Sequence, residues 1–244
     1  MDFLNGTFFT ELSFFKDNAF LIENMDLLVE GLWTTVTLLG ISLVFGFVFA
    51  IFVALARLSK SALLSYPAFL FTSVIRGTPL LVQIYIYYYG LGILFSQMPE
   101  VRSSFLWPYL RDGYWYIAFA LILSTAGYLG EVIRGGLLSV PKGEIETARA
   151  FGMSARKAFL RVRLPRTIYL LTPTLAGETV LLLKSTALAS TIAVVDLLGA
   201  ANRIRSMTFE VYKPLLLVAV IYLILTLVIE YVFKRIEKRI PVRA

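Results

Sequence analysis

Cysteine and histidine are both absent from this chain of 244 residues. The first absence excludes disulfide bonds and thiolate metal ligands, and the second removes the commonest general base and metal ligand. No Ser/His, paired-Asp or His-rich constellation is present, so we expect no catalytic residue and no metal site. A glycine-rich phosphate loop ending in Gly-Lys-Ser or Gly-Lys-Thr is missing too. We therefore expect a protein that is not an enzyme and has no cofactor of its own.

Charged residues are also scarce, at 16% against 58% hydrophobic residues, and the mean hydropathy is +0.78. This chain is far more apolar than an ordinary soluble domain. Its apolar residues fall in long runs, close to the roughly 20 residues that a helix needs to cross a bilayer. The net charge of +7 does not indicate a nucleic-acid partner, because a basic excess in a membrane protein usually marks its cytoplasmic surface. The composition predicts an all-α membrane protein.

Five apolar segments predict five transmembrane helices, at residues 27–56, 62–95, 114–133, 167–194 and 211–233. The second segment is too long for one straight helix, and Arg76-Gly77-Thr78-Pro79 interrupts it. We expect one crossing with a broken or kinked middle. Lysines and arginines gather after the first, third and fifth segments, which the positive-inside rule places on the cytoplasmic side. The N-terminus is then expected to be periplasmic and the C-terminus cytoplasmic.

The sequence predicts a single membrane domain with two flanks. Residues 1–26 predict an interfacial or periplasmic lead-in, because their phenylalanines are interspersed with acidic residues and do not form a signal peptide. Residues 27–233 form the transmembrane domain, which carries a cytoplasmic insert at residues 135–166. Residues 234–244 form a basic cytoplasmic tail.

The insert has the pattern of two short helices. Glu144 lies in a first turn, where negative charge suits the helix dipole, and Gly152 supplies a stop signal. Ser154 is placed to cap the second helix, which we expect to end at Leu164-Pro165. Such amphipathic helices either lie on the membrane against anionic lipid or dock into a groove of another protein. The residues alone leave both interpretations open.

A longer sequence pattern favours the second interpretation, in which the helices dock into a groove of another protein. Glu146-Thr147-Ala148, then Gly152, then Val162-Arg163-Leu164-Pro165 resembles, in residue type and spacing, the EAA loop of permeases in bacterial ATP-binding-cassette (ABC) importers. Thr147 and Val162 stand where that family usually has alanine and isoleucine, which are mild changes in size. The resemblance implies a type I importer permease fold in the bacterial inner membrane, with coupling helices that seat in a groove of a separate cytosolic ATPase dimer. It assigns these residues to the coupling: Glu146, Ala148, Gly152, Leu164 and Pro165.

Three further segments, at residues 76–83, 134–143 and 183–188, resemble the polar amino-acid branch of these permeases. Within that branch the chain is most similar to subunits for basic amino acids and opines, which are like histidine permease components. The resemblance implies import of arginine, ornithine, lysine, histidine or an opine, delivered by a periplasmic solute-binding protein. It also implies pairing with a second, related permease, as a heterodimer rather than a homodimer.

Ionisable side chains at bilayer depth are costly and are candidates for the substrate pathway. Arg76 either binds a substrate carboxylate or holds the carbonyls of the broken helix. Glu178 either meets a cationic group or is a structural carboxylate, paired with a base or bonded to Thr174; Gly177 precedes it where the family often has asparagine. Lys184 either takes part in transport or extends to the lipid headgroups. These three residues also motivate an alternative function, a passive channel or an ion-coupled secondary carrier for a polar solute.

Overall fold

The structure is a computed structural model that describes residues 23–239, so most of the predicted lead-in lies outside the described residues. The described residues form helices joined by short turns, without a strand among them. In chain order the helices are α3 (Met25–Leu58), α4 (Ala62–Gly77), α5 (Leu80–Tyr85), η2 (Ile86–Leu91), α6 (Gly92–Ser96), α7 (Pro99–Arg102), α8 (Trp107–Leu110), α9 (Gly113–Ser139), α10 (Lys142–Ala150), α11 (Ala155–Ala158), η3 (Phe159–Arg163), α12 (Leu164–Ser185), η4 (Thr186–Ile192), α13 (Leu197–Thr208) and α14 (Tyr212–Arg239). The predicted all-helical class is confirmed.

Within residues 23–239, four helical stretches are long and apolar enough to cross a bilayer: Met25–Leu58, Gly113–Ser139, Ala155–Ile192 and Tyr212–Lys238. The second predicted span is a bent pair, Ala62–Gly77 and Leu80–Ser96, whose axes differ by 105°. Thr78 and Pro79 are extended at the bend, because a proline disfavours helical backbone in the residue before it. The break was predicted, and the pair accounts for a fifth span when it is counted as one.

The predicted end of the second insert helix at Leu164-Pro165 is wrong. Helical backbone runs from Ala155 through the π-helical turn η3 and on to Ser185, so the insert continues directly into the fourth span. Pro165 lies in the first turn of α12. There its missing N–H and fixed φ are tolerated, so it does not end the helix.

Two helices extend past the ends of their predicted spans. α9 continues to Ser139, into the range predicted for the insert. An added Cβ at Gly136 would lie 2.6 Å from Cδ2 of Leu171, so this glycine is required by close packing against α12 and does not end the helix. α14 likewise continues to Arg239, into the predicted tail.

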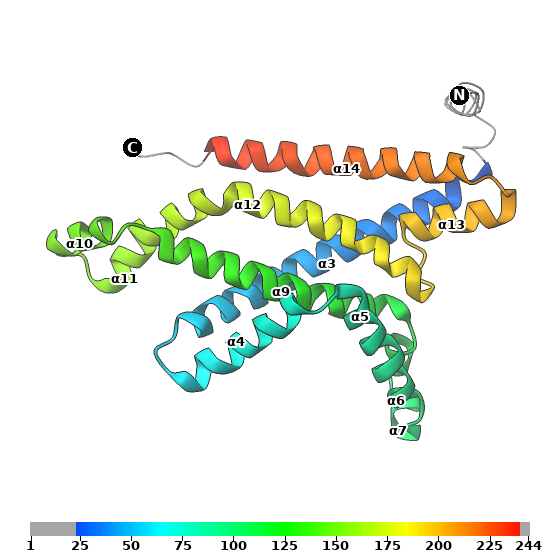
Figure 1. Cartoon of the computed structure of the whole chain (residues 1–244), viewed down its shortest axis with the longest axis horizontal. Coiled ribbons are helices and arrows are strands. Elements are labelled where there is room, and N and C mark those ends of the chain that lie inside the picture. The colour runs from blue at the N-terminus through cyan, green and yellow to red at the C-terminus, as the bar shows by residue number, and fades with distance from the viewer. Residues whose placement is uncertain (1–22, 240–244) are drawn as a thin grey trace.

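The first and third spans form the centre of the domain, where α3 crosses α9 (Figure 1). An added Cβ at Gly46 would lie 2.6 Å from the Cβ of Thr125, and one at Gly130 would lie 2.7 Å from Cγ1 of Val53. Small residues let membrane helices approach closely enough to gain dispersion energy. Beside this crossing, α5, α12 and η4 contribute to one buried apolar cluster with α3 and α9.

The connection between the fourth and fifth spans is fastened by a buried carboxylate. Asp196 is 0% exposed, and burial raises the pKa of its carboxyl to about 6. It accepts hydrogen bonds from the Gly199 N–H at 2.9 Å and from the Tyr222 hydroxyl of α14 at 3.2 Å. The neighbouring Leu197 N–H donates to Thr35 Oγ1 of α3 at 3.1 Å. These bonds join α3, α13 and α14.

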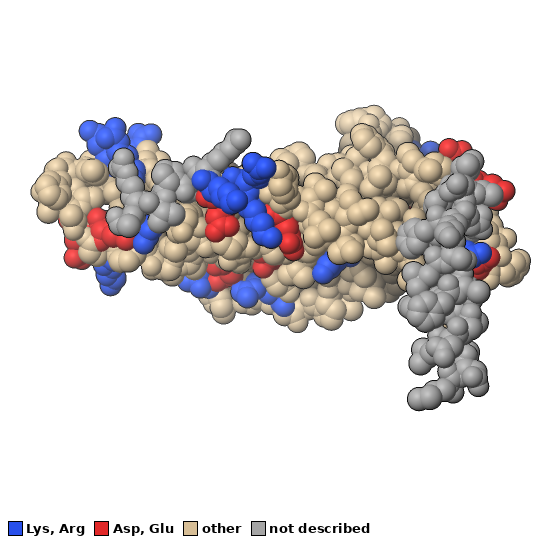
Figure 2. Space-filling model, turned by 90° about the horizontal axis from the view of Figure 1, so that it is seen from above, with Lys and Arg blue, Asp and Glu red and all other residues tan. Residues whose placement is uncertain are grey.

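The end of the molecule that carries α10, α11 and the C-terminal part of α14, here called the insert end, is rich in lysine and arginine (Figure 2). A largely uncharged belt separates it from the charged residues of the opposite end, where α13 and the start of α14 lie. This belt is what an apolar bilayer interior requires of the spans.

Candidate functional site

The exposed hairpin of α10 and α11 is the first candidate site. Gly152 follows α10 with φ of +81°, a left-handed conformation that favours glycine. Its N–H donates to the Arg149 carbonyl at 2.9 Å. Ser154 Oγ accepts from the Lys157 N–H at 3.4 Å and caps the next helix. The predicted stop and cap are both confirmed.

The hairpin presents a mixed surface of small, acidic and aromatic groups. Glu146, Thr147 and Gly152 are exposed, and Phe151 beside them is 83% exposed. Ala148, in contrast, is buried beneath that surface. At the base of the hairpin, Leu164 is partly buried and Pro165 is exposed.

A partly buried ion cluster joins two spans near the insert end. The Glu131 carboxylate of α9 accepts from Arg57 Nε of α3 at 2.7 Å and from Arg134 Nε at 2.8 Å. Glu131 and Arg134 are three residues apart on one helix, a spacing that favours an ion pair. Arg57 comes from 74 residues away in the sequence, so only the fold brings it to the cluster.

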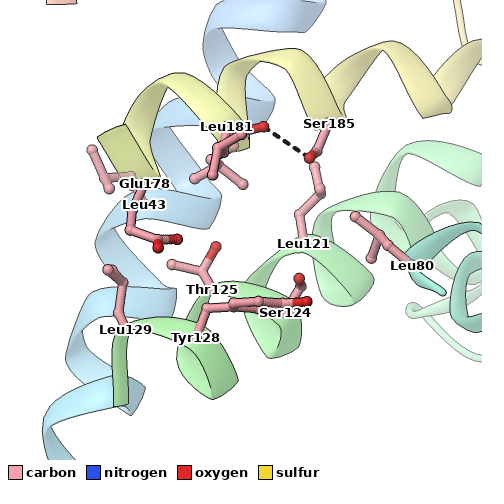
Figure 3. A pocket seen from close by; sticks show the side chains of 11 residues that line it. Leu43, Leu80, Leu121, Ser124, Thr125, Tyr128, Leu129, Glu178, Leu181 and Ser185 are labelled. Atoms are coloured by element: carbon pink, nitrogen blue, oxygen red, sulfur yellow. Dashed lines mark hydrogen bonds between the residues drawn. The ribbon is translucent and has the colours of Figure 1, made fainter. Parts of the chain in front are cut away.

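The second candidate site is a cavity of about 250 Å³ between α3, α9 and α12, shown in Figure 3. Its wall is mainly leucine. The polar groups are hydroxyls and one carboxylate, from Ser124, Thr125, Tyr128, Glu178 and Ser185. Ser185 Oγ is engaged with the Leu181 carbonyl at 2.8 Å. An apolar wall with a few polar groups is typical of a site for a small solute.

Glu178 is the charged group of this cavity. Among the described residues its carboxylate has no ion pair and no hydrogen bond, and Arg76 is the charged group that acts on it electrostatically. The predicted bond to Thr174 is not formed. Glu178 also lines a second groove of about 630 Å³ between α12 and α14, together with Glu230, Lys234 and Glu237 near the insert end. One carboxylate therefore belongs to the walls of two cavities.

Arg76 lies in the last turn of α4, next to the break, and its guanidinium lies over the ring of Tyr128, with Cζ 5.6 Å from the ring centroid. The broken-helix carbonyls are held by a different residue, Gln83. Its Nε2 donates to the carbonyls of Ile75 at 2.9 Å and Thr78 at 3.2 Å. The signal in the sequence was a glutamine, the only side-chain amide in this apolar segment near the break, four residues after Pro79. Sequence reasoning missed it.

Lys184 lies apart from the other two candidates. Its exposed side chain lines a groove of about 440 Å³ on the α14 side, with Tyr222 and Thr226. The structure thus brings Arg76 and Glu178 to the neighbourhood of one cavity and leaves Lys184 outside it.

This membrane domain has a charged cavity between its spans and an exposed helical hairpin at one end. Such an architecture is typical of a transport permease. The sequence model of the family described as binding-protein-dependent transport system inner membrane component matches residues 25–242. The chain belongs to this family and is a multi-pass inner-membrane permease subunit of an ABC importer.

Curated relatives agree with this assignment. The octopine transport system permease protein OccM of Rhizobium radiobacter is 43% identical over 221 residues, which are 91% of this chain and 89% of that protein. The histidine/lysine/arginine/ornithine transport system permease protein HisM of Escherichia coli K12 is 39% identical over 211 residues, 86% of this chain and 87% of that protein.

Solved structures agree as well. The structure described as an amino acid ABC transporter with histidines matches with a TM-score of 0.77 and 30% identity, over 90% of this chain and 96% of that chain. A MetNI methionine ABC transporter structure matches with a TM-score of 0.71 and 20% identity, over 89% of this chain and 97% of that chain, and supports the fold alone.

Proposed function

We propose that this permease imports a small amino acid with a cationic side chain, of the arginine, ornithine, lysine or histidine kind, or an opine. The observation that carries the proposal is the Glu178 carboxylate, which meets a solute-sized cavity without an ion pair among the described residues. A partly desolvated carboxylate is costly without a cation beside it, and the solute supplies that cation. The transport names of the octopine and histidine/lysine/arginine/ornithine relatives support the same class of solute.

Arg76 is assigned to the carboxylate of the solute. Its guanidinium is at the helix break, close enough to act on Glu178 but outside ion-pair distance of it. A zwitterionic solute between these two groups would satisfy both charges. Lys184 is not part of this arrangement and retains the structural alternative, an extended side chain at the helix surface.

The insert end is assigned to the cytoplasm, with the N-terminus on the periplasmic side. The gathering of lysine and arginine at that end supports this orientation. The exposed hairpin, through Glu146 and Gly152, then seats in a groove of a separate ATPase dimer, and Leu164 and Pro165 form its base. Hydrolysis of ATP belongs to that partner and not to this chain.

A second, related permease pairs with this chain across the spans that it leaves exposed. In the apolar 18-residue stretch of α14, only 11% is buried within the chain. Its exposed side chains include Leu223, Leu227 and Tyr231. One five-span unit is small for an alternating pathway, which favours a pair of permeases. A periplasmic binding protein delivers the solute, as the family description indicates. A binding-protein-dependent family does not favour the passive-channel or ion-coupled alternative.

The test is uptake into proteoliposomes that hold the complete importer. Arginine, ornithine, lysine, histidine, glutamine and opines are compared with and without ATP. Glu178→Gln is expected to raise KM for a cationic solute about tenfold, the equivalent of one charged contact. The matched control is Glu100→Gln, which removes the same charge from an exposed residue of α7. Equal kinetics for wild type and Glu178→Gln would remove Glu178 from the pathway, and uptake that proceeds without ATP would refute the importer.

A further inference from the structure

The C-terminal end of α9 is a place where backbone carbonyls lack partners within their own helix. The last four carbonyls of any α-helix need donors from elsewhere, and a cation near them is favoured by the helix dipole. In this chain Arg163 Nε, from η3, donates to the Leu137 carbonyl at 2.9 Å, across 26 residues of sequence. Leu137 is buried and Arg163 is partly buried, so this bond is partly shielded from solvent.

Four other contacts lie around this bond. Thr167 is 2% exposed, and its hydroxyl donates to the Arg163 carbonyl at 2.8 Å, with a longer contact of 3.4 Å to the Gly136 carbonyl. The missing side chain of Gly136 leaves room for Leu171 of α12. On the other side of the insert, Arg166 Nε lies 3.6 Å from Glu144 Oε1 of α10.

The chain connects the insert to the spans at both of its ends. Residues 139–142 join it to α9, and the continuous helix through η3 joins it to α12. The Arg163–Leu137 bond is a non-covalent connection between these two ends and closes the loop between α9 and α12 at its base. The cavity with Glu178 lies between the same two helices. Glu178 is eleven residues beyond Thr167, roughly 16 Å along the axis of α12 at the usual rise per residue.

We propose that Arg163 is a positioning residue for transport: its bond to the α9 carbonyl makes α9, α12 and the insert move as one body, so that displacement of the hairpin reaches the cavity. The bond ties the insert to α9, and the continuous helix from Ala155 to Ser185 carries the same motion to the Glu178 side of the cavity. Without Arg163 the hairpin still presents Glu146 and Gly152, since neither depends on that bond. It then moves against α9 instead of with it. The inference rests on the proposed coupling to an ATPase.

The first test measures solute transported per ATP hydrolysed, by the complete importer in proteoliposomes. Arg163→Ala is expected to assemble with the ATPase and to hydrolyse ATP, but to transport at least about tenfold less solute per ATP, as expected for the loss of one charged hydrogen bond. Arg163→Lys retains the charge and one donor, and is expected to recover part of the loss. The matched control is Arg161→Ala, two residues earlier in η3, where an exposed arginine makes no such bond. A purely structural role would lower the amount of protein without changing this ratio.

The second test measures distance directly, because the chain has no native cysteine. Spin labels at Gly135→Cys on α9 and Arg156→Cys on α11 occupy exposed positions. The distribution of distances between the two labels is expected to remain narrow with and without ATP in the otherwise wild-type importer, and to broaden when Arg163→Ala is added.

The outcomes separate the two proposals. A wild-type importer without ATP-driven uptake refutes the proposed function. ATP-driven wild-type uptake, with an unchanged ratio and a narrow distance in Arg163→Ala, overturns the role of Arg163 alone. If Arg163→Ala fails to accumulate, Arg163→Lys decides. A lowered ratio in that variant supports the role, and a wild-type ratio together with a narrow distance overturns it.

Discussion

Replacing Asp196 is expected to loosen the connection between the last two spans. Asp196→Ala removes the acceptor of the Gly199 and Leu198 N–H groups, at 2.9 and 3.3 Å, and such a helix cap is worth about 1 kcal/mol. It also removes the acceptor of the Tyr222 hydroxyl at 3.2 Å, worth about 1–2 kcal/mol for a bond to a charged or buried group. At a pH below 3.8, where the carboxyl is not ionised, the unfolding free energy is therefore expected to fall by about 2–3 kcal/mol. At the same pH, Asp196→Asn retains an oxygen for the cap and is expected to lose less than about 1 kcal/mol.

The dependence on pH gives a sharper test of the same site. Burial raises the pKa of Asp196 in the folded chain from 3.8 to about 6. A raised folded-state pKa means that the contribution to stability is complete below pH 3.8 and is lost as pH rises through about 6. The full difference is about 3 kcal/mol. Asp196→Asn cannot ionise. Its unfolding free energy, relative to that of wild type, is therefore expected to rise by that amount between about pH 3.5 and about pH 7, a range that spans both pKa values.

The assay is thermal unfolding in detergent, followed by tryptophan fluorescence, for wild type and both variants over this pH range. Two results would refute the reasoning. If Asp196→Ala melts like wild type at every pH, the carboxylate does not cap α13. If wild type and Asp196→Asn respond to pH alike, the carboxyl is not desolvated as its burial indicates.

Three further perturbations have defined outcomes. Gln83→Leu deprives the two carbonyls at the helix break of their donor, at about 1–3 kcal/mol for each one left unsatisfied, so the melting temperature should fall, and an unchanged value would contradict the role of the amide. Gly46→Val forces α3 away from α9, at about 1–3 kcal/mol, whereas Gly40→Val, which has open space around it, should be tolerated; equal effects of the two would argue against the close crossing. Gly152→Trp should leave the chain in the membrane but suppress solute-stimulated ATPase activity of the importer, and normal stimulation would count against docking of the hairpin.

The spans and the helix break were predictable because they depend on local properties. Long apolar runs form helices in a bilayer whatever their neighbours, and Pro79 disrupts the helix through its own covalent structure. Gly152 and Ser154 were predictable for the same reason, since a left-handed stop and a side-chain cap are local. The type of each element therefore followed from residues within a few positions of it.

Features that depend on packing between distant segments were not predictable. Nothing in the sequence around Gly136 indicates that Leu171 of α12 occupies the space that this glycine leaves. Arg163 appeared in the sequence only within the pattern Val162-Arg163-Leu164-Pro165, while its partner, the Leu137 carbonyl, lies on another span. Lys184 and Glu178 lie on the same helix, and the arrangement of the neighbouring spans places them in different cavities.

The position of Glu178 on the wall of both the inner cavity and the α12–α14 groove has a consequence for how a charged solute moves. A cation that passes from one cavity to the next usually separates from one counter-ion before it pairs with another. The unpaired cation between the two has a high free energy, which forms the barrier to its movement. Here the same carboxylate faces both cavities. Under the proposed function, a cationic solute would therefore keep the same carboxylate as its partner on both sides of the crossing, in place of two separate binding events.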